Sequence, residues 1–335
     1  MKSLEEVMDD VEEIHEAMKN HWGISKLWHI LCEDNWDKEA ENILEPHLYH
    51  LTGTGLSLEG DWQWTRAEGL ITTLNKKYDA QYLSEKHPNL KFIASVTTGV
   101  DHIDTEYAKQ KGIKIISLQG ETEFLRNVHA TAEHTMALML SLIRKIPAAH
   151  KDITENGNWD RELFQGIELK NRTLGVVGMG RVGHQVRKFA ETFGMHVIFY
   201  DIRYIDNPFV AKLPYILHNS DIVSIHIPLN ITTEKSFGIK EFQQMKPTTY
   251  FINTSRGQIV EENALLEALR NKWIAGAALD VVCNEPNINP ELVEYARQNQ
   301  NLLLTSHLGG NTVESRKSTQ IFIANRIKEY IENQC

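Results

Sequence analysis

Short apolar runs alternate with amphipathic segments over most of this chain, a pattern typical of parallel α/β proteins. In the first third, runs rich in Val, Ile, Leu and Phe are separated by segments whose apolar positions recur at helical spacing. The pattern predicts strands at 26–32, 69–74, 91–95 and 113–118, with helices at 78–87 and 104–111.

A second alternation begins at residue 173 and is longer than the first. It predicts strands at 173–177, 196–200, 222–225, 249–252, 274–279 and 302–305. Such a set of strands separated by helices is enough for a complete doubly wound sheet. The expected fold class is therefore α/β, with two doubly wound parallel-sheet domains, the first of them smaller.

The remaining segments predict how these domains are connected. An apolar helix at 130–146 is expected to end at Pro147, and the polar stretch 155–159 is expected to be a hinge. A last helix at 313–332 is expected to return to the first domain. Charged residues with apolar positions at helical spacing predict an additional helix within 1–22.

These elements divide the chain into an appended N-terminal helix (1–25), a first domain (26–120 with 309–335) and a second domain (121–308). The length supports more than one domain, because 335 residues exceed the roughly 250–300 at which a single core stops growing.

Composition narrows the possible partners. The chain has 35 basic and 45 acidic residues, a net charge of −10, which argues against nucleic acid or an anionic membrane. No apolar run is long enough to span a membrane. Cys32, Cys283 and Cys335 are scattered, which predicts reduced thiols in the cytoplasm, and no metal site is expected.

The most informative stretch is 174–183, an apolar run that leads into Gly178, Gly180 and Gly183. This spacing suits a tight turn, close approach of the backbone to a pyrophosphate, and close packing of helix on strand. A helix that begins at Arg181 would point its free N–H groups at the phosphates. Asp201 ends the next apolar run and can accept the ribose hydroxyls, which favours NAD over NADP, although Arg203 nearby could weaken that preference.

Three polar residues follow predicted strands of the second domain, where ligands bind in open α/β sheets. Arg256 can hold a carboxylate through two hydrogen bonds. A histidine next to a carboxylate is stabilised in its protonated form, so His307 with Glu285 would be an acid of the kind that protonates a carbonyl oxygen. Each residue taken alone could equally be structural.

Together these motifs resemble the D-isomer-specific 2-hydroxyacid dehydrogenase family. The resemblance includes 174–183 with Asp201, 226–229, 245–257, 280–286 and 307–310, and in the first domain 98–104. It implies a Rossmann NAD-binding second domain and a smaller flavodoxin-like first domain that binds substrate.

The resemblance also implies roles for individual residues in the interconversion of a D-2-hydroxy acid and its 2-keto acid. Arg256 would bind the substrate, His307 would act as acid and base, Glu285 would hold His307, and Asp280 would hold the nicotinamide carboxamide. The expected substrate-binding residues are Thr97, Thr98, Gly99, Arg256 and His307. The expected cofactor-binding residues are Gly178, Gly180, Arg181, Val182, Gly183, Asp201, His226, Pro228, Thr254, Asp280, Gly309 and Gly310.

Some features depart from the family and leave alternatives open. Ser95 and Thr72 stand where members that act on phosphoglycerate have arginine, so we expect an unphosphorylated substrate unless Lys76 or Lys77 binds the phosphate. Relatives that oxidise formate have Gln in place of Glu285. A corepressor-like protein that senses NAD without turnover is the alternative from another class.

A homodimer is expected, with the helix at 130–146 at its interface.

Overall fold

The computed structural model describes residues 20, 26, 28–45, 47–50, 65–204 and 211–334, without the side chains of 48–50. These residues form two compact units, one up to Glu121 and again from Arg316, the other from Thr122 to Ser315. Residues 309–315 thus belong to the second unit, whereas the sequence pattern assigned them to the first domain. The helix predicted within 1–22 lies outside the described residues, apart from residue 20.

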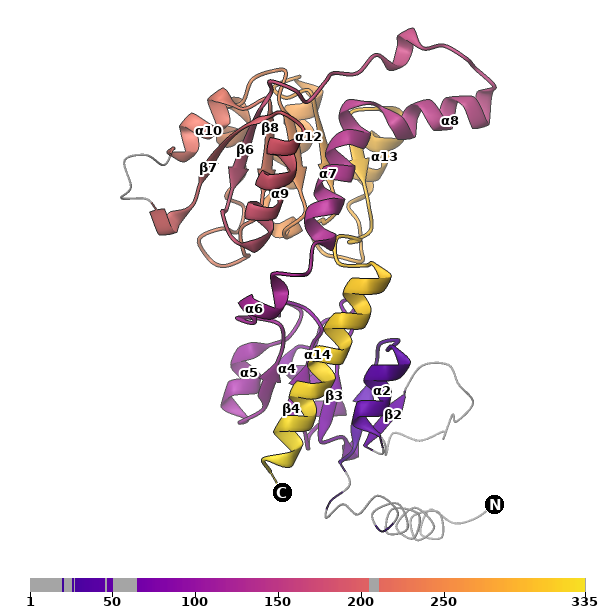
Figure 1. Ribbon diagram of the computed structural model, residues 1–335, viewed down its shortest axis with the longest axis vertical. Coiled ribbons are helices and arrows are strands. Elements are labelled where there is room, and N and C mark those ends of the chain that lie inside the picture. Colours follow the sequence, from indigo (N-terminus) through magenta and orange to yellow (C-terminus); the bar gives the residue numbers. More distant parts are fainter. Residues whose placement is uncertain are drawn as a thin grey trace. The chain divides into compact units, whose positions relative to one another are not determined.

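The first unit has a parallel sheet in the order β2-β1-β3-β4-β5 (Figure 1). Its strands are β1 (Ile30–Cys32), β2 (Leu48–His50), β3 (Gly69–Ile71), β4 (Phe92–Ala94) and β5 (Lys114–Ile116). Its helices are α2 (Lys38–Leu44), α4 (Ala80–Lys86), α5 (Thr105–Gln110) and most of α14 (Val313–Glu332). This is the flavodoxin-like order, and it agrees with the predicted small doubly wound domain.

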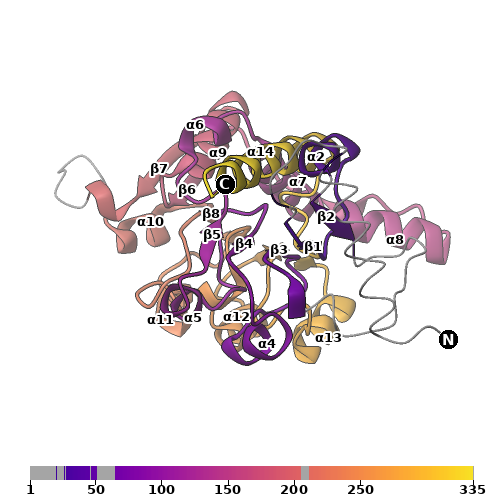
Figure 2. The same ribbon diagram turned by 90° about the horizontal axis from the view of Figure 1, so that it is seen from below.

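The last helix returns to the first unit, as the sequence pattern predicts. In Figures 1 and 2, α14 lies beside α2. Two contacts near the start of α2 hold α14 there: Asp37 N donates to Gln320 Oε1 at 2.8 Å, and Arg316 Nη2 lies 3.2 Å from Asp34 Oδ1.

The second unit has a six-stranded parallel sheet in the order β11-β10-β9-β8-β6-β7. Its strands are β6 (Thr173–Val177), β7 (His196–Tyr200), β8 (Ile222–Ile225), β9 (Tyr250–Asn253), β10 (Gly276–Leu279) and β11 (Leu302–Leu304). Its helices are α6 (Thr122–Leu125), α7 (Ala130–Ile143), α8 (Ile146–Asn156), α9 (Arg181–Thr192), α10 (Leu213–Asn219), α11 (Ile239–Gln243), α12 (Glu262–Arg270) and α13 (Pro290–Gln298), with 3-10 turns η1 (Glu162–Phe164), η2 (Ile202–Tyr204) and η3 (Gly257–Ile259). All six predicted strands are present.

Helix α7 belongs to the core of this unit. Met136, Met139, Leu142 and Ile143 pack with the inner residues of β6 and α9. The apolar character of this helix is therefore explained by intradomain packing, which removes the argument for placing it at a dimer interface.

The boundaries around Pro147 differ from the prediction. α7 ends at Ile143, Lys145 adopts a left-handed backbone with φ of 53°, and Pro147 lies in the first turn of α8. Proline is tolerated there because the first N–H groups of a helix have no partner within the helix. α8 then continues to Asn156, so the predicted hinge at 155–159 lies inside the second unit.

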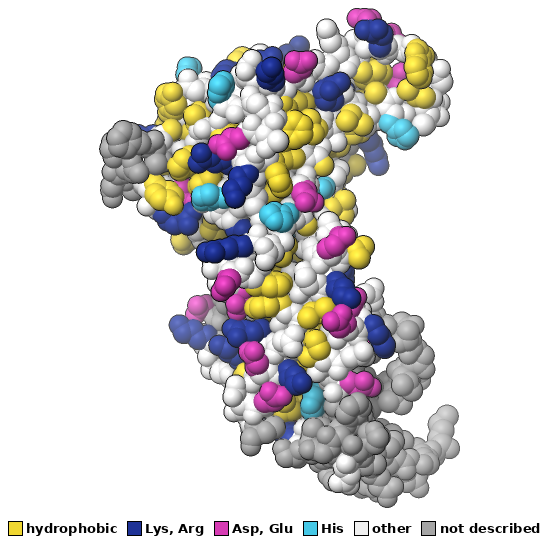
Figure 3. All heavy atoms as spheres, in the orientation of Figure 1, with side chains coloured by type: hydrophobic (Ala, Val, Ile, Leu, Met, Phe, Trp, Pro, Cys, Tyr) yellow, Lys and Arg dark blue, Asp and Glu magenta, His cyan; other side chains and the backbone are white. Residues whose placement is uncertain are grey.

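Helix α8 and the loop after it form an arm, which we define as residues 146–163. No residue of α8 is buried, and Ile146, Ile153, Trp159 and Leu163 are exposed apolar residues of the arm. Figure 3 shows apolar side chains on this projecting part of the second unit. Among the helices that the structure describes, none has the length and hydropathy required to cross a membrane.

Candidate functional site

The glycine turn after β6 lies where the second sheet changes direction, with β7 on one side of β6 and β8 on the other. Gly178 has a φ of 96°, and a Cβ there would lie 2.5 Å from the carbonyl oxygen of His226. A Cβ on Gly183 would lie 2.1 Å from the Gly178 oxygen. Both positions therefore require glycine.

Gly180 is different, because a Cβ at this position would meet no atom within 4 Å. It precedes the first residue of α9, so the free N–H groups of that helix border this open space. An open backbone surface at a helix N-terminus, at the switch point of a parallel sheet, fits the pyrophosphate of a dinucleotide.

Asp201 follows β7, as expected for the residue that binds ribose, and Arg203 contacts both of its oxygens. Asp201 Oδ1 accepts from Arg203 Nε at 2.9 Å, and Oδ2 accepts from Arg203 Nη2 and from Met179 N, each at 2.8 Å. The hydrogen bond from the Arg203 side chain is the main reason that the pKa of Asp201 falls to about 2. Asp201 is thus ionised and fits ribose, but its oxygens are shared with a guanidinium.

Several other predicted cofactor residues also make contacts within the chain. Arg181 donates from Nη1 to Val128 O at 2.7 Å, and Val182 packs on the core. Burial lowers the pKa of His226 to about 3, so this ring is neutral at physiological pH. Pro228 O accepts from Thr233 at 2.7 Å, and the hydroxyl of Thr254 lies 2.9 Å from that of Thr135.

His307 and Glu285 form a direct pair at the carboxyl edge of the same sheet. His307 follows β11, Glu285 lies in the loop after β10, and Nδ1 of the ring is 2.7 Å from Glu285 Oε2. The other oxygen of Glu285 accepts from Val282 N at 2.9 Å. With Nδ1 held by the carboxylate, Nε2 is the nitrogen that remains to exchange a proton with a ligand.

Arg256 comes from the loop after β9. The next residue, Gly257, packs this loop against the loop that carries Glu285. A Cβ on Gly257 would lie 1.9 Å from the carbonyl carbon of Val282, so the two backbones touch. Arg256 Nη1 donates to Ser255 O at 2.8 Å. The structure therefore connects the loops of Arg256, Glu285 and His307 through contacts along adjacent strands.

Asp280 is the hydrogen-bonding centre of this edge, and its side chain is buried. Its Oδ1 lies 3.0 Å from His134 Nε2 and accepts from Thr305 Oγ1 at 2.7 Å and from Leu308 N at 2.8 Å. Its Oδ2 accepts from Gly309 N at 2.8 Å. Asp280 thus holds the turn that begins at His307, in addition to the cofactor contact that the resemblance implies.

The predicted substrate loop lies in the first unit, after β4. Thr97 Oγ1 donates to Gly99 O at 2.7 Å and lies 2.8 Å from Ser95 Oγ. Thr98 lies in the sequence between Thr97 and Gly99. Thr97 O accepts from Leu118 N at 3.0 Å, which fixes the loop to the segment after β5.

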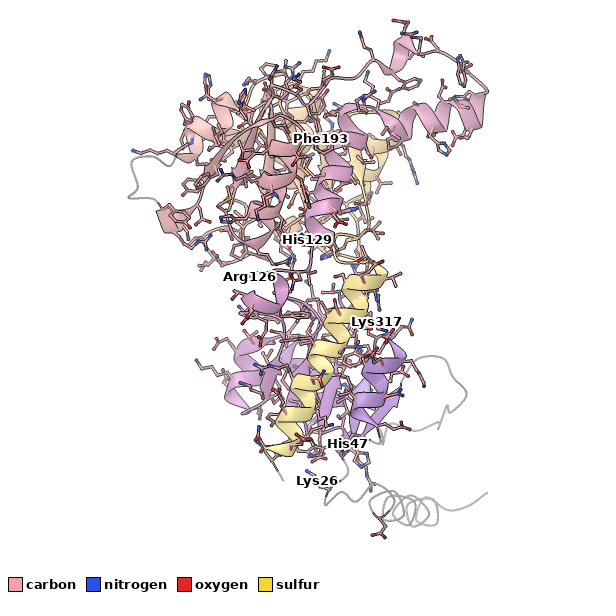
Figure 4. All side chains as sticks on the ribbon, in the orientation of Figure 1. Lys26, His47, Arg126, His129, Phe193 and Lys317 are labelled. Atoms are coloured by element: carbon pink, nitrogen blue, oxygen red, sulfur yellow. The ribbon has the colours of Figure 1, made fainter. Side chains whose placement is uncertain are left out.

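His134 is a neighbour of Asp280 that the sequence-based expectations above did not include. A possible signal was a histidine inside an otherwise apolar helix. In the segment before that helix, Arg126 and His129 connect α6 to α7 (Figure 4). Over the described residues, no group of three or more His, Cys, Asp or Glu is arranged to hold a metal ion.

Comparison with known proteins places this geometry in a family. A model of the D-isomer specific 2-hydroxyacid dehydrogenase NAD-binding domain matches residues 136–309. A glyoxylate reductase from Thermococcus litoralis is 35% identical over 80% of this chain and 81% of that protein. A D-3-phosphoglycerate dehydrogenase from Archaeoglobus fulgidus is 34% identical over 86% of this chain but only 56% of that protein.

Solved structures agree with this relationship. A D-lactate dehydrogenase from Aquifex aeolicus, complexed with NAD and lactic acid, matches with a TM-score of 0.75 and 25% identity, over 91% of this chain and 96% of that one. The relatives are enzymes, and nothing in these comparisons favours the corepressor alternative. With the glycine turn and its acid, the paired His307 and Glu285, and matches that include most of its length, this chain belongs to the D-isomer specific 2-hydroxyacid dehydrogenase family and is an NAD-dependent oxidoreductase.

Proposed function

We propose that the enzyme reduces a small, unphosphorylated 2-keto acid to the D-2-hydroxy acid, with His307, Glu285 and Arg256 as its catalytic residues. The observation that supports this proposal most is the 2.7 Å contact between His307 Nδ1 and Glu285 Oε2 at the carboxyl edge of a NAD-binding sheet. The relatives named glyoxylate reductase agree with a small substrate.

In this proposal each residue has a separate task. Arg256 binds the substrate carboxylate, and Thr97, Thr98 and Gly99 of the first unit bind it as well. His307 gives the proton on Nε2 to the carbonyl oxygen, while Glu285 stabilises the ring cation before transfer and fixes its orientation. The bound nicotinamide supplies the hydride. Positioning and one proton transfer are thus the work of the protein.

A panel of 2-keto acids tests the proposal. We expect oxidation of NADH, followed by its absorbance, with glyoxylate, hydroxypyruvate or pyruvate. NADH that binds tightly but is oxidised by none of these acids would contradict the proposal and favour the binding-protein alternative.

We also propose that the enzyme is a homodimer whose interface includes the arm, residues 146–163. A helix with no buried residue, followed by Trp159 with 89% of its surface exposed, supports an interface here rather than on α7. Homodimers are the most common symmetric assemblies, which gives further support. Location in the cytoplasm stays a prediction.

A further inference from the structure

A charged cluster at the carboxyl edge of the first sheet has no part in the roles assigned above. Glu33 directly follows β1, and Lys76 lies in the loop after β3. Lys76 Nζ is 3.0 Å from Glu33 Oε1 and 2.5 Å from the Tyr82 hydroxyl, and it lies 4.0 Å from the centre of the Tyr82 ring. Tyr78 donates to the other oxygen of Glu33.

This cluster carries no net charge. Burial, with the neighbouring Glu33, raises the pKa of both Tyr78 and Tyr82, so both phenols keep their protons at neutral pH. The Glu33 side chain is 8% exposed and that of Lys76 is 34% exposed. An ammonium group therefore reaches the surface while a nearly buried carboxylate in contact with it balances its charge.

The cluster lies where a ligand of this sheet is expected. β2 and β3 lie on opposite sides of β1, and open parallel sheets bind ligands outside the carboxyl ends of their strands at such a switch point. Glu33 and Lys76 follow the two central strands of that arrangement, β1 and β3.

Hydrogen bonds connect the cluster to the proposed substrate loop. Thr73 N donates to the Tyr78 hydroxyl at 3.1 Å, and the preceding Thr72 hydroxyl lies 3.2 Å from His102 Nε2. The same nitrogen lies 3.3 Å from Ser95 Oγ, which contacts Thr97. The loop that carries Lys76 is thus held in one network with Thr97.

We propose that Glu33 and Lys76 determine which 2-keto acids the enzyme accepts, presenting a charge-balanced pair that disfavours a phosphate at the distal end of the substrate. An unpaired lysine would attract phosphate, but here Glu33 cancels that attraction and would repel the anion. Lys76 is therefore not the phosphate partner that the sequence left open. This inference rests on the proposed function.

The test compares two acids that differ only in a phosphate ester, 3-phosphohydroxypyruvate and hydroxypyruvate. The measured quantity is kcat/KM for 3-phosphohydroxypyruvate divided by kcat/KM for hydroxypyruvate. Because the net charge of the pair becomes positive in Glu33→Gln, we expect its ratio to rise on the order of tenfold or more. The pair becomes negative in Lys76→Met, and the ratio should fall. The double variant is neutral again, and its ratio should return to within about threefold of the original.

Glu68→Gln is the matched control. Glu68 pairs with Lys26 at 2.6 Å, just before β3, at the opposite edge of the same sheet. Figure 4 shows Lys26 and His47 at one end of the first unit and Lys317, in the first turns of α14, away from that end. This control removes the same charge, and its ratio should not change.

A ratio that stays within twofold of the original in both single variants would overturn the inference, as would a fall in Glu33→Gln. If the unaltered enzyme reduces neither of these two acids, nor glyoxylate nor pyruvate, the proposed function fails instead. Calorimetric titration of the same variants with 3-phosphoglycerate and glycerate then carries the test. The quantity compared is the affinity for 3-phosphoglycerate divided by the affinity for glycerate. A ratio that rises in Glu33→Gln and falls in Lys76→Met supports the charge-balanced pair, and equal ratios in all variants refute it.

Discussion

At the scale of the residue, His307 has a backbone conformation that its residue type seldom adopts. Its φ is 56°, in the left-handed region that costs a non-glycine residue about 1–2 kcal/mol. Asp280 offsets this cost, because its backbone oxygen accepts from His307 N at 2.8 Å and its carboxylate accepts from the next two N–H groups. One buried carboxylate thus holds the turn that directs the imidazole to Glu285.

The ionisation of Asp280 predicts how stability depends on pH. Burial raises its pKa, but hydrogen bonds from His134, Thr305 and Leu308 outweigh burial and lower the pKa from 3.8 to about 2. The folded state therefore gains about 2 kcal/mol from this group above pH 4, and that gain disappears as pH falls toward 2. Urea unfolding between pH 2 and 7 measures it.

Asp280→Asn is the comparison for this measurement. The difference in unfolding free energy between the original and the variant should be constant from pH 7 to 5 and shrink by about 2 kcal/mol by pH 2. A difference that does not change with pH would show that the carboxylate is not stabilised in its ionised form.

Asp201 and Arg203 predict opposite effects on cofactor choice. Arg203→Ala removes the guanidinium contacts to both Asp201 oxygens, which leaves them more available to ribose hydroxyls, and it removes a cation that can bind a 2′-phosphate, so NADH should gain on NADPH. Asp201→Ala removes the repelling carboxylate and should shift the ratio of dissociation constants the other way, each by about tenfold. Fluorescence titration of the reduced cofactors gives both ratios. Shifts of the same sign would refute this account.

At the scale of the element, apolar periodicity predicted the strands well but not the polar contacts between them. β6, β8, β9 and β10 are mostly buried runs with a strong local signal, whereas β2 pairs only with β1 and lies at the sheet edge, where the local signal is weak. The contact of His134 with Asp280 joins residues 146 apart in sequence, and no periodic pattern encodes it. The site motifs were predictable because each lies at the end of a strand or in the loop that follows it.

His134 makes α7 a support for the site, and this role can be tested. His134→Leu keeps the helix apolar but removes a donor from a buried carboxylate, which should destabilise the fold by about 1–3 kcal/mol. His134→Gln retains an N–H donor and should recover part of that loss.

Chemical denaturation measures both variants, with His218→Leu on the exposed face of α10 as the control. Equal stability of His134→Leu and His218→Leu would show that the contact with Asp280 contributes nothing.

At the scale of the whole molecule, the chain passes between its two units at 121–122 and again at 315–316. The length of the chain and its two successive patterns of alternating strands and helices predicted two units. The polar stretch at 155–159, however, was a poor guide to their boundary. Polar, turn-rich sequence occurs in surface loops as well as in linkers, and here it ends α8 within the arm.

The arm predicts the oligomeric state. The double variant Trp159→Ser with Leu163→Ser should convert a dimer into a monomer of about half the mass, as measured by light scattering after gel filtration. Ile231→Ser removes an equally exposed apolar side chain elsewhere in the second unit and should leave the dimer intact. A monomeric original protein, or a double variant that remains dimeric, would contradict the proposed interface.

The central claim is that the imidazole of His307, held by Glu285, gives its proton to a keto acid beside bound NADH. The most direct measurement is kcat of His307→Asn with the best keto acid, together with the dissociation constant of NADH. The account predicts that kcat falls by about 10²–10⁴ while NADH affinity stays within about threefold. A variant that turns over at the original rate would contradict it.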